Sequence, residues 1–98
     1  MKNLEETLQG SVPTMVEFYA TWCPHCQRMM PVMAELKERT AGKANVVQID
    51  GDENSDLLDK YHVKHFPTFI LFKDGQEVWR DGGEKPYSEL KDMIDRFV

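Results

Sequence analysis

The chain has 98 residues, 41% of them hydrophobic, which is enough for one hydrophobic core but not for two. We therefore expect a single domain over residues 1–98. The net charge of −5 comes from 17 acidic and 12 basic residues interspersed along the chain, so we expect neither nucleic acid nor a membrane surface as a partner.

The first predicted elements are a short helix and a buried strand. Asn3 followed by Glu6 is typical of a helix start, and Gly10 ends that helix. Residues 14–20 are almost all apolar and rich in strand-forming residues, which predicts a strand covered on both faces. Glu17 is the exception within this strand.

A helix and a second strand follow. Pro24 suits the first turn of a helix, and apolar residues then recur on one face until Gly42, with Pro31 expected to kink the helix. Residues 45–50 form the second strand. Because a helix connects the two strands, we expect them to be parallel with a right-handed crossover.

The last third of the chain contains a weak helix, a hairpin and a final helix. We predict a helix over 55–61, strands over 68–72 and 77–79, and a tight turn at Asp74-Gly75. The final amphipathic helix follows Gly82-Gly83. Its apolar face carries Leu90, Met93, Ile94 and Phe97. The element order predicts an α/β fold.

Cys23 and Cys26 are the only cysteines, so they cannot form the disulfide framework of a small secreted domain. A bridge that closes a ring of about four residues adds only roughly 2 kcal/mol of stability, which favours a chemical role. Cys23 precedes a helix, where free N–H groups and the helix dipole favour a thiolate. We predict that Cys23 is an exposed nucleophile and that Cys26, one turn inward, is the shielded thiol that resolves the mixed disulfide.

A Cys-x-x-Cys pair also occurs in zinc and soft-metal sites. Four ligands would require two of the three histidines, His25, His62 and His65, and His25 lies inside the pair, where it is poorly placed to share its metal. We therefore expect no metal. His25 is either an ordinary exposed histidine or a cation that favours the Cys23 thiolate, and its place inside the pair favours the second interpretation.

Further motifs follow in order along the chain. They are residues 16–20 leading into Thr21-Trp22-Cys23, the spacing from Cys26 to Pro31, the segments Phe66-Pro67-Thr68 and Phe72-Lys73-Asp74-Gly75, and Gly83. Together these motifs resemble the thioredoxin superfamily from about residue 11 to residue 98. The resemblance implies the thioredoxin fold, with three layers, α/β/α, around a central mixed sheet. Because no strand is evident before residue 12, we expect about four strands.

The resemblance also implies an activity and a set of site residues. The protein would be a thiol-disulfide oxidoreductase without a cofactor, working through a redox-active Cys23–Cys26 disulfide. Pro67 would be cis and lie beside the sulfurs. The backbone of Phe66 would pair with an extended substrate segment, and further substrate contacts would come from Trp22 and Pro24.

The sequence departs from the thioredoxin pattern in three respects. Thioredoxins usually have Gly-Pro between the cysteines, whereas Pro24-His25 is similar to the centre of DsbA-type oxidases. Glu17 aligns with the buried acid of the family and would take a proton from Cys26, unless it reaches solvent at the end of its strand. Val46 stands where many thioredoxins have a lysine near that acid, so we expect Glu17 to lack a cationic partner.

The Pro-His centre predicts an intermediate redox potential. If His25 and the helix end together lowered the Cys23 pKa from about 8.5 to about 6, the dithiol would be favoured at pH 7 by roughly 1.4 kcal/mol, or about 30 mV. Thioredoxin and DsbA differ by about 150 mV, or about 7 kcal/mol. His25 alone therefore does not account for the difference in redox potential between the two proteins.

Several functions are compatible with these residues. The first is a monomeric reductase of protein disulfides that receives electrons from a thioredoxin-reductase-like donor. The alternatives are a disulfide oxidase or isomerase of an extracytoplasmic compartment, a binding module without turnover, and a metal carrier. As written, the chain has no apolar run of roughly 20 residues and no signal-like start, which predicts a cytoplasmic protein. If it were a fragment of a longer precursor, a periplasmic or otherwise exported location would be open.

Overall fold

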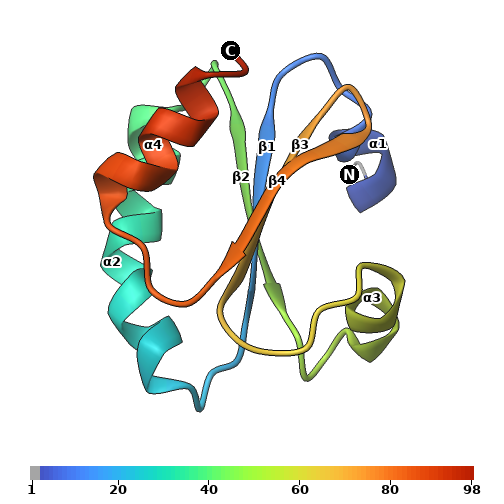
Figure 1. The fold of residues 1–98 in the computed structure, drawn as a ribbon, viewed down its shortest axis with the longest axis vertical. Coiled ribbons are helices and arrows are strands. Elements are labelled where there is room, and N and C mark those ends of the chain that lie inside the picture. Colours follow the sequence, from blue (N-terminus) through green and yellow to red (C-terminus); the bar gives the residue numbers. More distant parts are fainter. Residues whose placement is uncertain (1–2) are drawn as a thin grey trace.

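The computed structural model describes residues 3–98, which form four helices and four strands (Figure 1). In chain order they are α1 Leu4–Leu8, β1 Thr14–Tyr19, α2 Pro24–Arg39, β2 Asn45–Asp50, α3 Ser55–Lys60, β3 Thr68–Lys73, β4 Gln76–Gly82 and α4 Tyr87–Asp95. The order α-β-α-β-α-β-β-α predicted from the sequence is confirmed. The predicted cap is confirmed too, because the Asn3 side chain accepts a hydrogen bond from the Glu6 N–H.

The four strands form one mixed sheet in the order β2-β1-β3-β4. β1 and β2 are parallel, with Glu17 opposite Gln48, because α2 carries the chain back to the start of the sheet. β3 runs antiparallel to both β1 and β4. Parallel β1 and β2 and the four-stranded mixed sheet both agree with the prediction.

Helices cover both faces of the sheet, which gives the three layers of the predicted fold. α2 and α4 lie on one face, and α1 and α3 lie on the other (Figure 1). Alternate residues of β3 face the two sides: Phe69 and Leu71 pack in the cluster with α2 and α4, and Ile70 and Phe72 pack in the other cluster. Burial on both faces explains why the strand sequences are continuously apolar.

Two predicted elements differ from the structure by more than one residue at an end. α2 ends at Arg39 rather than near Gly42, because the Thr40 hydroxyl donates to the Leu36 carbonyl and Gly42 has a φ of +84°. β4 extends over Gln76–Gly82 rather than 77–79, since it pairs with β3 along the whole hairpin. The predicted turn at 74–75 has two residues with positive φ, as tight hairpins require.

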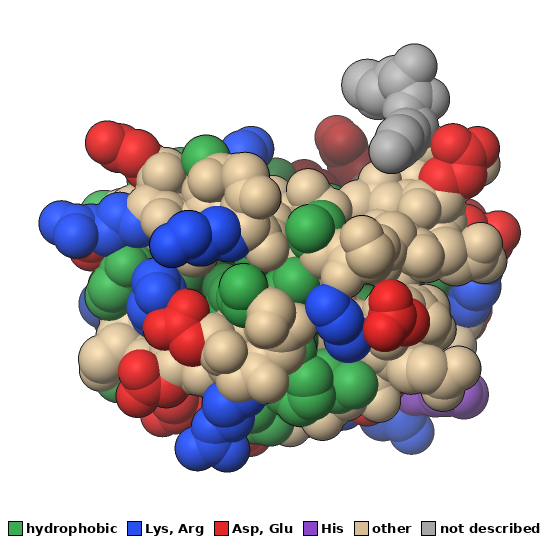
Figure 2. Space-filling model, turned by 90° about the horizontal axis from the view of Figure 1, so that it is seen from above, with side chains coloured by type: hydrophobic (Ala, Val, Ile, Leu, Met, Phe, Trp, Pro, Cys, Tyr) green, Lys and Arg blue, Asp and Glu red, His purple; other side chains and the backbone are tan. Residues whose placement is uncertain are grey.

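The charge distribution agrees with the sequence. On the face seen in Figure 2, acidic and basic side chains are intermixed, without a patch of one sign. Within residues 3–98, no helix is long and apolar enough to cross a bilayer. The topology brings the end of β1, the start of α2 and the segment before β3 to one end of the molecule, and the cysteines lie there.

Candidate active site

The fold places Cys23 at the N-terminus of α2. Cys23 is the N-cap residue with an extended backbone (φ −87°, ψ 115°), and Pro24 occupies the first helical turn. The Cys23 N–H donates to the Ala20 carbonyl (3.1 Å), which links the end of β1 to the helix start. Free N–H groups of the first turn therefore surround the Cys23 sulfur.

The prediction that Cys23 is exposed is wrong. Cys23 is 5% exposed and Cys26 is 4% exposed, so burial does not distinguish the two free thiols. Cys23 is covered because its thiol faces the Phe66 carbonyl, with Sγ and O separated by 3.8 Å. The difference between the cysteines is one of acidity.

The surroundings of Cys23 lower its pKa overall. Burial alone raises the pKa of this thiol, but hydrogen bonds to its sulfur outweigh the effect. They come from the Cys26 thiol and from the backbone N–H groups of Cys26 and His25, and the charge of Arg28 adds to them. A thiolate at Cys23 is thereby favoured, which is the chemical requirement for a nucleophile.

The surroundings of Cys26 have the opposite effect. Burial raises the pKa of the Cys26 thiol to about 12, and the nearby charges of Cys23 and Glu17 add to the increase. Cys26 also contributes to the small cluster that contains Ala20 and Cys23. A thiol of this kind stays protonated until a base removes its proton.

Glu17 is buried in the middle of β1. It is 1% exposed, so the alternative that it reaches solvent is wrong. Burial raises the pKa of this carboxyl, and a hydrogen bond from Gln48 Nε2 to Glu17 Oε1 (3.0 Å) partly opposes the rise. The second oxygen, Oε2, is buried with no hydrogen-bond partner among residues 3–98. A buried acid with one unpartnered oxygen near a thiol of raised pKa is suited to exchange a proton with that thiol.

The hydrogen-bond partner of Glu17 among residues 3–98 is an amide, that of Gln48. Val46 is 8% exposed and packs in the apolar cluster under α2. Gln48, two residues further along β2, reaches Glu17 from an exposed position. The described ion pairs of residues 3–98 do not include Glu17.

The segment before β3 lies against Cys23. The peptide bond between Phe66 and Pro67 is cis, as the resemblance implies, and Pro67 is buried. The Phe66 carbonyl faces the Cys23 thiol, and the Pro67 carbonyl accepts a hydrogen bond from the Gly83 N–H (2.9 Å). Three segments distant in sequence therefore meet around Cys23.

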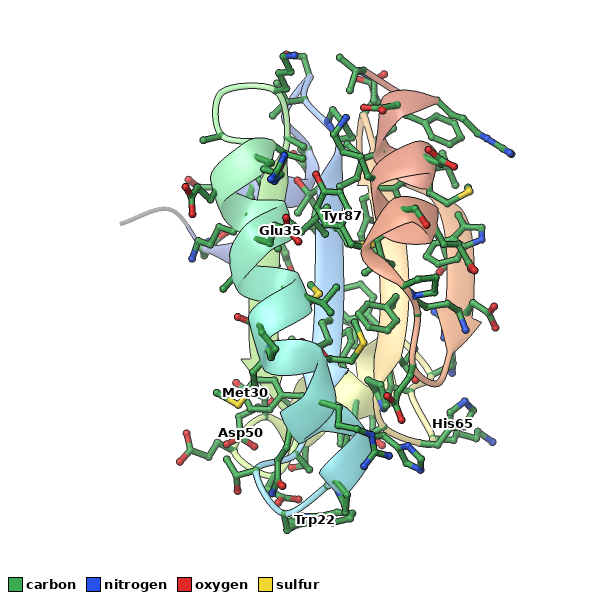
Figure 3. The ribbon with its side chains drawn as sticks, turned by 90° about the vertical axis from the view of Figure 1, so that its left-hand side faces the viewer. Trp22, Met30, Glu35, Asp50, His65 and Tyr87 are labelled. Carbon is green, nitrogen blue, oxygen red and sulfur yellow. The ribbon has the colours of Figure 1, made fainter. Side chains whose placement is uncertain are left out.

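Trp22 forms the tip of the molecule beside the site. Its indole is 64% exposed and packs edge-on against Phe66, with ring centroids 6.1 Å apart, rather than directly on the sulfurs. The indole N–H donates to Asp52 (2.8 Å), which fixes the ring. Figure 3 shows Trp22 at this end, with His65 to one side and Asp50 and Met30 to the other.

His25 is exposed and belongs to a charged cluster. Its Nδ1 lies 2.7 Å from Glu84 Oε2, and the same carboxylate oxygen accepts hydrogen bonds from Arg28 Nε (3.0 Å) and Arg28 Nη2 (2.8 Å). Hydrogen bonds from Arg28 and His25 lower the pKa of Glu84 to about 2, so this carboxylate is ionised at neutral pH. The cluster lies on the first two turns of α2, which carry His25 and Arg28, and on the loop that follows β4, which carries Glu84.

Residues 3–98 contain no group of three or more His, Cys, Asp or Glu side chains placed to hold a metal ion. His62 and His65 line, with Arg80, an open hollow to which neither cysteine contributes. The methionines of α2 divide between core and surface: Met29 and Met33 are buried, and Met30 is 64% exposed at the rim of a hollow beside Cys26.

Sequence reasoning missed three residues of this site. Gln48 could have been found by aligning the two parallel strands, because it is the register partner of Glu17. Arg28 lies one turn after Pro24-His25, but its charge alone gave no reason to select it. Glu84 gave no signal in the sequence, since only the tertiary fold brings its loop to α2.

The site has two thiols at the start of one helix, with opposite pKa shifts, beside a buried carboxyl. Such a site is suited to disulfide exchange. The fold and the site together define a thiol-disulfide oxidoreductase. Comparison with known proteins identifies the particular family. The family model named Thioredoxin matches residues 1–96. The chain belongs to the thioredoxin family.

Individual relatives agree with this assignment. The chain is 38% identical to a thioredoxin of Staphylococcus saprophyticus over 96 residues, covering 98% of this chain and 91% of the relative. It is 37% identical to the chloroplastic thioredoxin Y of Oryza sativa over 94 residues, which is 95% of this chain but only 56% of the rice protein. A thioredoxin variant from Halobacterium salinarum superposes with a TM-score of 0.87 at 36% identity, covering 96% of this chain and 81% of that one.

Proposed function

We propose that this chain, working as a single domain, reduces protein disulfides, with Cys23 as the nucleophile and Cys26 as the resolving thiol. The observation that carries the proposal is the opposite shift of the two thiols: the pKa of Cys23 is lowered and that of Cys26 is raised to about 12. Cys23 therefore forms a thiolate more readily than Cys26, which sets the order of the two steps.

In the first step, the Cys23 thiolate attacks one sulfur of a substrate disulfide. The substrate S–S bond breaks, its other sulfur leaves as a thiolate and takes a proton, and a mixed disulfide joins Cys23 to the substrate. In the second step, Cys26 gives its proton to Glu17 and attacks the Cys23 sulfur. The bond between Cys23 and the substrate breaks, and the substrate leaves as a thiolate that takes a proton from solvent. Cys23 and Cys26 form a disulfide, so two electrons have passed to the substrate.

The residues around Cys23 would bind the substrate. An extended segment would pair with the backbone of Phe66 beside Pro67, while the exposed Trp22 and Pro24 would contact its side chains. The edge-on packing of Trp22 on Phe66 supports this arrangement, because it joins two of these residues into one surface.

A dithiol donor must restore the reduced form, and a flavoprotein of the thioredoxin-reductase class is the donor that we propose. A monomer suits this exchange, since both partners must reach the same sulfur. We further propose a reducing compartment such as the cytoplasm, where a dithiol is maintained.

The equilibrium potential of the Cys23/Cys26 pair tests the direction of the reaction. It would be measured in glutathione buffers by Trp22 fluorescence, with the redox state checked by thiol alkylation and mass. A value below about −230 mV supports a reductase, and a value above about −180 mV would instead indicate an oxidase or isomerase. Reduction of insulin with dithiothreitol as donor measures turnover directly.

Trapping tests the roles of the two cysteines. Cys26→Ser should accumulate a mixed disulfide with a model disulfide substrate, whereas Cys23→Ser should form none. Equal accumulation by both variants would contradict the assigned order.

A further inference from the structure

Cys23 is part of a closed series of contacts between three segments of the chain, and the Glu84 side chain makes the last of these contacts. The Cys23 sulfur faces the Phe66 carbonyl, and the next carbonyl, that of Pro67, accepts a hydrogen bond from the Gly83 N–H (2.9 Å). Glu84 follows Gly83 and reaches back to the first turn of α2, on which Cys23 is the N-cap. The Glu84 carboxylate thus connects the loop after β4 to the helix whose N-cap residue is Cys23.

All of the Glu84 contacts converge on a single oxygen. Oε2 lies 2.7 Å from His25 Nδ1 and accepts two hydrogen bonds from Arg28, at 3.0 Å from Nε and 2.8 Å from Nη2. The His25 and Arg28 side chains are 60% and 56% exposed, and that of Glu84 is 38% exposed. An exposed arginine without such a partner would sample many rotamers, and its charge would spend less time near Cys23.

We propose that Glu84 is a positioning residue of the active site, which holds the Arg28 guanidinium and the His25 ring at the start of α2, where Cys23 is the N-cap residue, and so increases the reactivity of the Cys23 sulfur. The proposal deepens the proposed function, because it rests on Cys23 as the nucleophile. Arg28 is one of the groups that favour the Cys23 thiolate, and Glu84 acts on Cys23 through it.

The sign of the effect separates positioning from simple charge. A carboxylate that acted on Cys23 only through space would disfavour the thiolate, so its removal would make Cys23 more reactive. A carboxylate that positions Arg28 and His25 has the opposite effect, and its removal makes Cys23 less reactive.

The experiment is the initial rate of Cys23 alkylation by iodoacetamide at pH 6 on the full chain in its dithiol form. Glu84→Ala should slow the reaction by about threefold, which is the scale of an exposed ion pair. Glu84→Gln should fall between Glu84→Ala and the wild type, because its amide oxygen still accepts hydrogen bonds. The matched control is Glu38→Ala, which removes the same charge from an exposed position on α2 and should leave the rate unchanged.

A double variant tests whether Glu84 acts through Arg28. Arg28→Met alone should also slow alkylation by about threefold. In the Arg28→Met background, Glu84→Ala should have less than half of its effect in the wild-type background. An unchanged or faster rate for Glu84→Ala, or the full effect without Arg28, would overturn the proposal.

Two controls distinguish a change in alkylation rate from a loss of folding and from a loss of turnover. Far-UV circular dichroism checks that each variant is folded, and if Glu84→Ala is not, an unchanged rate for Arg28→Met is sufficient to reject the proposal. Insulin reduction by the wild type tests the proposed function independently. If the alkylation rates contradict the role of Glu84 while the wild type reduces insulin, only the Glu84 proposal is rejected. If the wild type does not reduce insulin, the proposed function is rejected whatever the alkylation rates are.

Discussion

The two sides of the first turn of α2 present opposite environments to sulfur atoms only three residues apart. On the side of Cys23, charged and exposed groups gather, with Arg28 and Glu84 in a hydrogen-bonded cluster. On the side of Cys26, the neighbours are buried, with Glu17 1% exposed and bonded to the neutral amide of Gln48.

The comparison shows that burial alone does not set the reactivity of a thiol. Cys23 and Cys26 are equally buried, yet the pKa of Cys23 is lowered and that of Cys26 is raised to about 12. Hydrogen bonds to the sulfur and a nearby positive charge outweigh desolvation at Cys23, whereas desolvation and negative charge act together at Cys26. The predictions below test this contrast, beginning with the largest expected effect.

The contrast predicts selective alkylation of the dithiol. The lowered pKa of Cys23 and the raised pKa of Cys26 favour the Cys23 thiolate at pH 7, so Cys23 should be alkylated first by an excess on the order of tenfold or more. Iodoacetamide labelling followed by peptide mass analysis measures the ratio of first products. Comparable labelling of the two cysteines would show that the contrast is absent.

Replacing the buried acid should separate stability from activity. Glu17→Leu removes a buried oxygen without a partner, so the free energy of unfolding at pH 7 should rise by about 1–3 kcal/mol. Insulin reduction should become slower, because Cys26 loses its proton acceptor. Urea denaturation measures the first effect. A destabilised Glu17→Leu variant would mean that the carboxyl contributes net stability.

Altering the charged side should change the redox potential. His25→Pro removes a potential cation beside Cys23, so the dithiol should become less stable and the potential should fall by up to about 30 mV, or about 1.4 kcal/mol. Equilibration with glutathione measures the shift. His62→Asn, which replaces an exposed histidine away from the cysteines, is the control and should leave the potential unchanged.

The sequence predicted the fold well because its signals are local and periodic. The apolar strand at 14–20, the turn at 74–75 and the helix start at Pro24 each follow from residue types at fixed spacing, and the structure has all three. The ends of α2 and β4 were less accurate. They depend on a side-chain bond from Thr40 and on pairing between strands, which local patterns do not contain.

The candidate site was predictable only in part. Cys23, Cys26 and Glu17 stand out because their residue types are unusual at their positions. The exposure of Cys23 was predicted wrongly, since its cover comes from Phe66, 43 residues away. Glu84 escaped prediction for the same reason: an exposed glutamate in a loop is ordinary until the fold brings it 2.7 Å from His25.

The smallest predicted effect concerns the pH dependence of stability. The folded-state pKa of Glu17 is raised above 4.5 by burial, so the folded protein holds this proton more tightly than the unfolded chain. The stabilisation is fully present below about pH 4.5 and is lost as the pH rises through the folded-state pKa. The wild type should therefore lose stability relative to Glu17→Gln between pH 4.5 and pH 7, as urea denaturation at several pH values would measure.

Gln48→Leu sharpens this last test. The hydrogen bond from Gln48 lowers the pKa of Glu17, so its removal should extend the loss of stability to higher pH. At pH 7, Gln48→Leu should cost about 1 kcal/mol, since one hydrogen bond to a buried carboxyl is lost. The variant Gln48→Leu/Glu17→Gln should show neither pH effect. If the double variant kept the pH dependence of Gln48→Leu, a group other than Glu17 would be responsible.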